Sequence, residues 1–113
     1  MTEALAAADK HEERAHEAEI YRVKGELLLR QDDSNTVEAQ SCFERAIEIA
    51  RKQSAKSLEL RATTSLARLL ISQGKRDEAR AMLGEIYGWF TEGFDTRDLK
   101  DAEALLDELN AAA

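Results

Sequence analysis

The chain of 113 residues is long enough for one small domain and carries a formal net charge of −7, so generic binding to nucleic acid or to an anionic membrane is not expected. Proline is absent and glycine occurs only five times, while alanine, leucine and charged residues dominate, which favours helix almost throughout. The sequence has no long apolar run, its N-terminus is too acidic for a signal peptide, and Cys42 is the single cysteine, so a cytoplasmic location is expected.

The first predicted helix spans about residues 3–31, with fraying or a break expected near residues 9–16. Its second half carries two interleaved apolar sets at the spacing of a buried stripe, Ala18, Tyr21 and Leu28, and Ile20, Val23 and Leu27. Residues 1–17 hold mainly alanines and charged residues around Leu5, which offer little apolar area to bury. We therefore expect an N-terminal helical extension of low stability ahead of the main domain.

A polar turn at about residues 32–36 leads into a second helix that runs to about residue 53. Ser34, Asn35 or Thr36 can cap this helix, and Asn35 with Glu38 has the spacing of a capping box. The helix presents one apolar face, which consists of Ala39, Phe43, Ala46, Ile47 and Ala50.

Three further helices follow short connections. Ser57 is the expected cap of a third helix that ends at about residue 73, before Gly74, a common helix stop. A fourth helix covers about residues 76–88. Asp95 or Thr96 caps a fifth helix that runs to about residue 110, and residues 111–113 are expected to be disordered.

Two stretches about forty residues apart share the same pattern, a small residue inside an apolar helix face followed by a second apolar helix. Such self-similarity is typical of a stacked helical repeat. Helices joined by short turns pack antiparallel, so two hairpins and a final helix should form one stack. Gly25 and Ala67 are expected where the partner helix comes close, because a larger side chain there would push the helices apart.

The chain resembles the tetratricopeptide repeat family. The residues of the first repeat that match the family pattern are Tyr21, Gly25, Leu28, Ala39, Phe43 and Ala46, and those of the second are Ala67, Leu70, Gly74, Ala79 and Leu83. The resemblance implies an all-α fold, in which antiparallel helix hairpins stack as a short right-handed solenoid. It places repeat one at about 18–53, repeat two at about 57–88 and a capping helix at about 95–110, in a domain of residues 18–110.

The resemblance also implies a non-catalytic protein–protein interaction module whose partner is another protein or a peptide. In this family the first helix of each pair lines the concave face. By position, the residues expected there are Glu19, Arg22, Glu26, Leu29 and Arg30 from repeat one, and Arg61, Thr64, Arg68, Ile71 and Ser72 from repeat two.

A second resemblance concerns the longer strings at residues 19–29, 55–61 and 87–96. These strings look like the C-terminal region of large bacterial signalling proteins that pair a nucleotide-cyclase or transcription-factor domain with a P-loop ATPase module. The resemblance implies that the chain is a regulatory or scaffolding tail. No cyclase or ATPase motif is present in these residues, so no catalytic activity carries over.

No catalytic, metal or cofactor site is expected. His11 and His16 flank two glutamates, but they are five residues apart, and a helical zinc motif requires a spacing of four to put both imidazoles on one face. Cys42 has no histidine nearby in sequence to act as its base, which favours a packed thiol. A small enzyme therefore stays a remote alternative.

Homo-oligomerisation is a closer alternative, because two repeats and a cap form a thin stack with open ends. It would make a second copy of the chain the partner.

Aromatic residues gather near the end of the fourth helix, where Tyr87, Trp89, Phe90 and Phe94 fall within eight residues. One interpretation has these side chains fold inward and seal the groove between the fourth and fifth helices, and we favour it because Gly88 and Gly93 free the backbone to turn. The other leaves Trp89, Phe90 and Phe94 exposed as anchors for a partner.

Overall fold

A computed structural model describes residues 3–91 and 96–111, with the side chains of residues 16–32, 34–91 and 96–111. The described residues form helices and no strand, so the predicted all-α class is confirmed. The elements are α1 (Glu3–Gln31), the short 3-10 turn η1 (Asp33–Asn35), α2 (Thr36–Lys52), α3 (Lys56–Ser72), α4 (Arg76–Tyr87) and α5 (Arg97–Ala111). Of the expected disordered tail, Ala111 belongs to α5, and residues 112–113 lie outside the described part.

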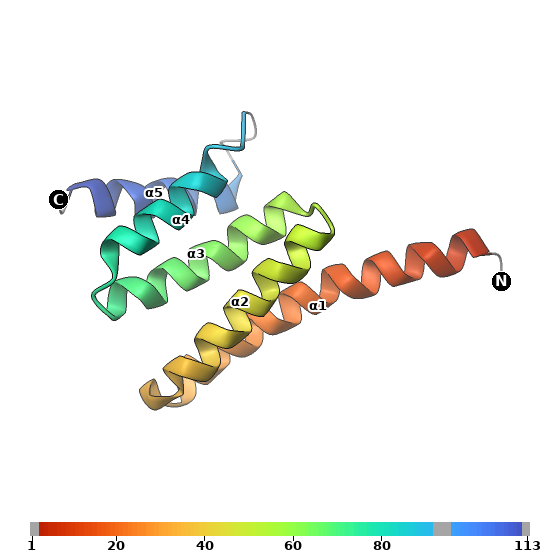
Figure 1. The fold of residues 1–113 in the computed structure, drawn as a ribbon, viewed down its shortest axis with the longest axis horizontal. Helices are drawn as coiled ribbons and strands as arrows, with labels where there is room; N and C mark the ends of the chain where they lie inside the picture. Colours follow the sequence, from red (N-terminus) through yellow and green to blue (C-terminus); the bar gives the residue numbers. More distant parts are fainter. Residues whose placement is uncertain (1–2, 92–95, 112–113) are drawn as a thin grey trace.

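The helices stack as two hairpins and a final helix, as predicted (Figure 1). Each helix packs against the next one along the chain, and α3 also contacts both α1 and α5. α3 is therefore the central helix of the stack. α1 is continuous from Glu3 to Gln31, so the break predicted near residues 9–16 is absent, and its N-terminal part extends past the other helices (Figure 1).

The two turns that lead into α3 and α4 repeat the same backbone geometry. Ser54 and Gly74 both adopt left-handed φ angles, of 54° and 80°. In each turn the N–H of the following residue donates to the carbonyl five residues before it, at 2.9 and 2.8 Å. This hydrogen bond is the Schellman helix stop, and it confirms the predicted role of Gly74. Ser54 adopts the same conformation at a higher steric cost because it has a Cβ atom.

The predicted helix caps are wrong in two places. Asn35 precedes α2 but makes no side-chain cap and forms no capping box with Glu38. Its amide instead donates to the carbonyl of Leu28 at 3.1 Å and ties the turn back to α1, while the Asp32 carboxylate caps η1. Ser57 lies inside α3, because that helix begins at Lys56 and Ala55 takes the cap position, two residues before the predicted cap.

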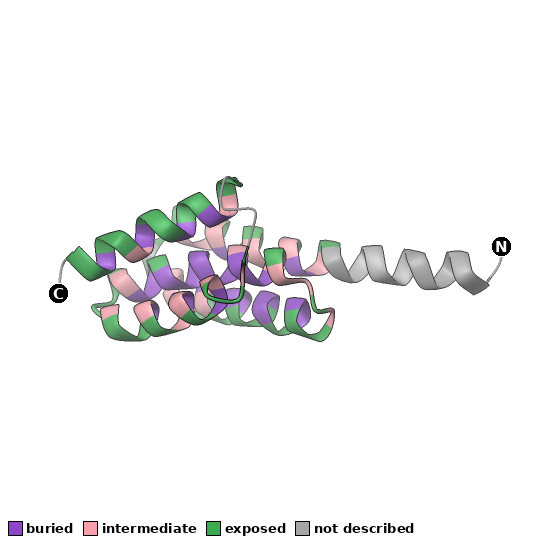
Figure 2. Ribbon diagram, turned by 90° about the horizontal axis from the view of Figure 1, so that it is seen from above, coloured by how far each residue is buried: buried purple, intermediate pink, exposed green. Residues whose placement is uncertain are grey.

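The hydrophobic core runs through the stack on the inner faces of the helices (Figure 2, purple). Its largest fully buried side chains are those of Phe43, Leu60, Leu70, Leu83 and Leu109. The ring of Phe43 occupies the space beside Gly25, so the predicted close approach of α1 and α2 is confirmed. Cys42 is buried, as expected for a packed thiol.

Only one of the two apolar sets on α1 is buried. Ala18 lies in the core and Tyr21 and Leu28 pack against it. The set of Ile20, Val23 and Leu27 is 63%, 43% and 50% exposed, so the prediction of a second buried stripe is wrong. A helix at the end of a stack has neighbours on one side only, and the stripe on its opposite side meets no described residue that would bury it.

The aromatic cluster divides between core and surface. Tyr87 and Phe90 pack against the core, but Trp89 is 58% exposed, so the prediction that Trp89 seals the stack is wrong. The side chains of adjacent residues in a turn point in different directions, and here the Phe90 side chain points toward the core while that of Trp89 points toward solvent. Trp89 makes an edge-on contact with the Phe90 ring at 5.2 Å between centroids. Phe94 lies outside the described residues.

Candidate protein-binding groove

The three first helices of the stack, α1, α3 and α5, touch in succession and present one continuous surface. Two cavities, of about 430 and 480 Å³, are hollowed into this surface and share Ser65 and Arg68 of α3. We refer to the two together as the first-helix groove. It lies on the side where the sequence predicts the concave, partner-binding face.

One cavity of the first-helix groove is polar and lies where α3 faces α1 and α5. Besides the shared pair it is lined by Arg22, Arg61, Thr64, Arg97, Asp98 and Asp101. Basic side chains from three different helices therefore converge here, together with two carboxylates from the first turns of α5.

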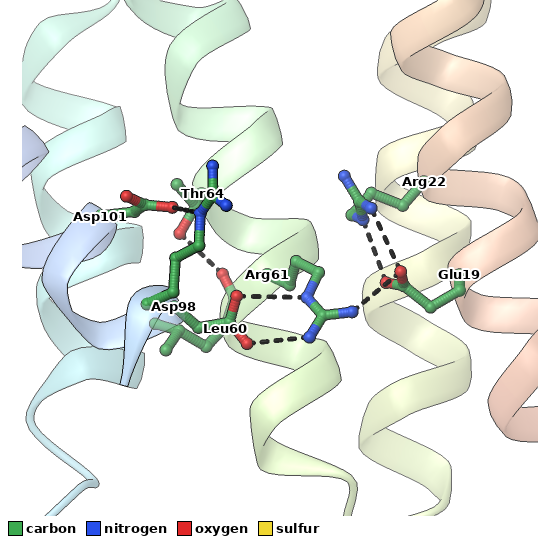
Figure 3. A network of polar contacts seen from close by, with 8 residues as sticks. Glu19, Arg22, Leu60, Arg61, Thr64, Asp98 and Asp101 are labelled. Carbon is green, nitrogen blue, oxygen red and sulfur yellow. Dashed lines mark hydrogen bonds and ion pairs between the residues drawn. The ribbon is translucent and has the colours of Figure 1, made fainter. Parts of the chain in front are cut away.

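Arg61 is the centre of a network that joins all three helices (Figure 3). Its guanidinium donates to Glu19 of α1 at 2.9 Å and makes a two-point contact with Asp98 of α5 at 2.9 and 3.2 Å. Arg22 donates to the same Glu19 carboxylate at 3.0 and 3.1 Å. Planar two-point pairing holds both partners in one orientation. Arg61 therefore acts as a structural bridge between α1 and α5.

The network shifts the ionisation of its members in the direction that favours charge. Partial burial by itself raises the pKa of the Glu19 carboxyl, but the hydrogen bonds from Arg22 and Arg61 outweigh it and hold that pKa below its ordinary value. The hydrogen bond with Asp98, followed by the one with Glu19, raises the pKa of the Arg61 guanidinium. The charges of Glu19 and Arg61 are therefore both paired within the protein.

Arg68 differs from the other arginines of this cavity. It is exposed, at the junction of the two cavities, and forms no ion pair with any residue of the described part of the chain. Thr64 is nearby, but its hydroxyl donates to the carbonyl of Leu60 at 2.8 Å. The Thr64 residue is also only 5% exposed. Arg68 thus has donor capacity left for a partner at the point where the two cavities meet.

The second cavity has a more mixed character. It runs between α1 and the C-terminal half of α3 and is lined by Glu26, Leu29, Thr36, Leu69, Ser72 and Gln73 in addition to Ser65 and Arg68. Leu29 and Leu69 supply its apolar surface, and the others supply donors and acceptors on its rim. A cavity of this kind suits an apolar side chain that is flanked by polar backbone.

The structure places most of the predicted concave-face residues at the first-helix groove. The predicted residues that line the groove are Arg22, Glu26, Leu29, Arg61, Thr64, Arg68 and Ser72, and Glu19 is hydrogen-bonded at its edge. Arg30 is exposed and lines neither cavity, and Ile71 packs against the core. Both were expected on this face.

Sequence reasoning missed Arg97, Asp98 and Asp101, because α5 was expected only to cap the stack. A signal was present. Glu19, Arg61 and Asp98 are separated by 42 and 37 residues, close to one repeat length, and their charges alternate in sign. Equivalent positions of successive first helices lie side by side in a repeat stack, so this alternation predicts a cross-helix bridge.

Among the described residues, no group of three or more His, Cys, Asp and Glu side chains could hold a metal ion. His16 is exposed, and the side chain of His11 lies outside the described residues. No described helix is both long and apolar enough to cross a bilayer.

A family model for the tetratricopeptide repeat matches residues 16–88, which is more than half of the chain. No curated protein and no solved structure matches the chain significantly. The matched residues run from the middle of α1 to the end of α4. They include the residues of α1, α2 and α3 that line the first-helix groove.

Proposed function

The chain belongs to the tetratricopeptide repeat family, and from that premise we propose that it is a non-catalytic module that binds a segment of another protein in the first-helix groove. Repeats of this family generally mediate protein–protein interaction, and they are typically non-catalytic. The observation that carries the proposal is Arg68, an exposed cation without an ion pair among the described residues, at the point where the two cavities meet.

The chemistry of the groove suggests how a segment would lie in it. An apolar side chain enters the cavity beside Leu29 and Leu69, and Arg68 donates to a carbonyl or carboxylate oxygen of the same segment. The Arg61 bridge keeps α1, α3 and α5 in register, so the groove needs little rearrangement on binding. Pre-ordering of this kind reduces the entropy cost of association.

We further propose that the module is the regulatory or scaffolding tail of a bacterial signalling protein of the cyclase and P-loop ATPase type. The support is the resemblance of residues 19–29, 55–61 and 87–96 to such C-terminal regions. In that setting the groove would hold either another domain of the same protein or a protein that controls it, and catalysis would lie elsewhere.

A capture experiment with paired variants tests the groove. The tagged chain is used as bait in a bacterial lysate, beside Arg68→Glu and Arg30→Glu. The two substitutions change the net charge equally, but Arg30 lines neither cavity of the groove. We expect proteins retained by the wild type and by Arg30→Glu to be lost with Arg68→Glu. Equal retention by all three baits would contradict the proposal.

Homo-oligomerisation is the second candidate, and one observation favours it. Ile20, Val23 and Leu27 form an exposed apolar stripe on the outer side of α1. A second copy could cover this stripe with its own α1, because exposed apolar stripes mark association surfaces. Sedimentation velocity at increasing concentration, with Val23→Glu as the comparison, separates the candidates: a chain that stays monomeric throughout removes this one.

A further inference from the structure

A second groove lies on the other side of α3, between the second helices α2 and α4, and it shares no lining residue with the first-helix groove. It consists of two cavities, of about 430 and 160 Å³, that join at Arg51 and Met82. We refer to it as the second-helix groove. Its floor is apolar and is formed by Ile47, Leu66, Leu70, Met82 and Ile86.

Helical periodicity explains the shape of the second-helix groove. On α2 the residues facing it are Gln40, Glu44, Ile47 and Arg51, and on α4 they begin with Glu78 and Met82 and continue toward Trp89. These are steps of three and four residues, which form one ridge along each helix. At 1.5 Å per residue the ridge on α2 is about 16 Å long, enough for about three turns of a docked helix.

Trp89 lies at one end of the second-helix groove. Its backbone N–H donates to the carbonyl of Ile86 at 3.2 Å, so the turn that ends α4 sets the backbone position of Trp89. Lys56 Nζ lies 5.5 Å from the centre of the indole ring, and Phe90 supports the ring edge. An indole that is 58% exposed and is contacted by Lys56 and Phe90 is suited to anchor an apolar partner.

The charges on the rim indicate the sign of the partner. The bases Arg51, Lys52 and Lys56 are each paired within the chain, with Glu59 or Glu48 at 3.0 to 3.4 Å. The rim carboxylates of Glu44, Glu78 and Glu85, by contrast, form no ion pair with any residue that the structure describes. The charge left for a partner on this rim is therefore negative.

We propose that the second-helix groove is a second docking surface, and that its occupant is a positively charged amphipathic helix of another protein. The apolar face of that helix would lie on Met82, Ile86 and the Trp89 indole, and its lysines or arginines would pair with Glu44 and Glu78. This surface is independent of the first-helix groove, so one chain could hold two partners, one on each side of α3.

Fluorescence of Trp89 tests the proposal directly, because Trp89 is the only tryptophan in the chain. The probe is a tryptophan-free amphipathic helical peptide of Leu and Lys, with a Leu and Glu peptide of the same pattern as its comparison. We expect a saturable blue shift with the Leu and Lys peptide and none with the other. No shift with either peptide, or the same shift with both, overturns the proposal.

Charge reversal distinguishes docking in the groove from general attraction to an acidic protein. Glu44→Lys with Glu78→Lys reverses the rim, while Glu38→Lys with Glu108→Lys makes the same change at exposed positions outside both grooves. We expect the rim pair to weaken binding of the Leu and Lys peptide about tenfold and the control pair to leave it nearly unchanged. If both double variants melt like the wild type and bind the Leu and Lys peptide equally weakly, the effect comes from net charge alone and the assignment is overturned.

Discussion

A Cβ atom on Gly25 would lie 2.6 Å from Cε1 of Phe43, and a further two atoms of the same ring lie within 3.0 Å of it. The Phe43 side chain is fully buried, so it has no free space into which to move. The hairpin of α1 and α2 therefore depends on the absence of a side chain at position 25, although glycine is a poor residue inside a helix.

Substitution at Gly25 should destabilise the fold in proportion to size. We expect Gly25→Ala to lower the free energy of unfolding by about 1–3 kcal/mol and Gly25→Leu by roughly 2–4 kcal/mol, because overpacking outweighs the gain in helix propensity. Gly84→Ala is the control, since nothing lies within 4 Å of its Cβ position, and it should stabilise by up to about 1 kcal/mol. Urea denaturation measures all three, and a Gly25→Ala variant as stable as the wild type would contradict the packing.

Ser54→Gly should stabilise the protein. Ser54 has a left-handed φ of 54° at the same place in its turn as Gly74, and only glycine adopts that conformation without steric cost. We expect a gain of about 0.5–1 kcal/mol in thermal or chemical denaturation. Ser57→Gly, three residues later but inside α3, should instead lower stability by about 0.5 kcal/mol. If both variants lose stability, the turn does not require the left-handed conformation.

Removal of the Arg61 bridge should cost about 1–2 kcal/mol. Its contacts with Glu19 and Asp98 are part-buried, but the Arg61 side chain is 38% exposed, so solvent screens the pairs and limits their worth. Arg61→Gln is the test variant. Arg45→Gln, which removes a single exposed pair with Glu48, should change stability by less than about 0.5 kcal/mol. A double-mutant cycle of Arg61 with Asp98 should give a coupling above about 0.5 kcal/mol, and additivity would rule out the bridge.

Stability should fall in acid in a way that depends on Glu19. Its pKa in the folded protein lies below the ordinary 4.5, because Arg22 and Arg61 hydrogen-bond the ionised form. Glu19 therefore stabilises the fold at pH values above 4.5, and this contribution is lost as the pH falls through the folded pKa. In thermal melts, the melting temperature of the wild type should exceed that of Glu19→Gln at neutral pH, and the two melting temperatures should converge in acid. A difference that is independent of pH would contradict the ion-pair network.

Trp89 should behave as a surface residue in the isolated chain. Its emission should be that of a partly hydrated indole, and acrylamide should quench it readily, because 58% of the residue is exposed. Trp89→Ala should cost less than about 1 kcal/mol, well below the usual cost of removing a buried aromatic, whereas Phe90→Ala should cost more because Phe90 packs against the core. A blue-shifted Trp89 that resists quenching in a monomer would contradict the exposed position.

The helices of this protein could be predicted closely from sequence, because the signals that define a helix are local. Apolar residues at steps of three and four, the absence of proline and the stop at Gly74 act within a few turns of the chain. The match of Gly25, Phe43 and Ala67 to a known repeat then supplied the antiparallel stack. The caps were less predictable, since Asn35 hydrogen-bonds Leu28 of the preceding helix in place of its own backbone neighbours.

Two features were decided by the tertiary structure alone. Helical spacing makes both apolar stripes of α1 equally suitable for burial, and only the position of α2 and α3 selects the stripe with Ala18 over the one with Val23. The turn after α4 has one inward place, which Phe90 takes and Trp89 does not. Each outcome depends on which neighbour is present on a given side, and a periodicity along one helix carries no information about its neighbours.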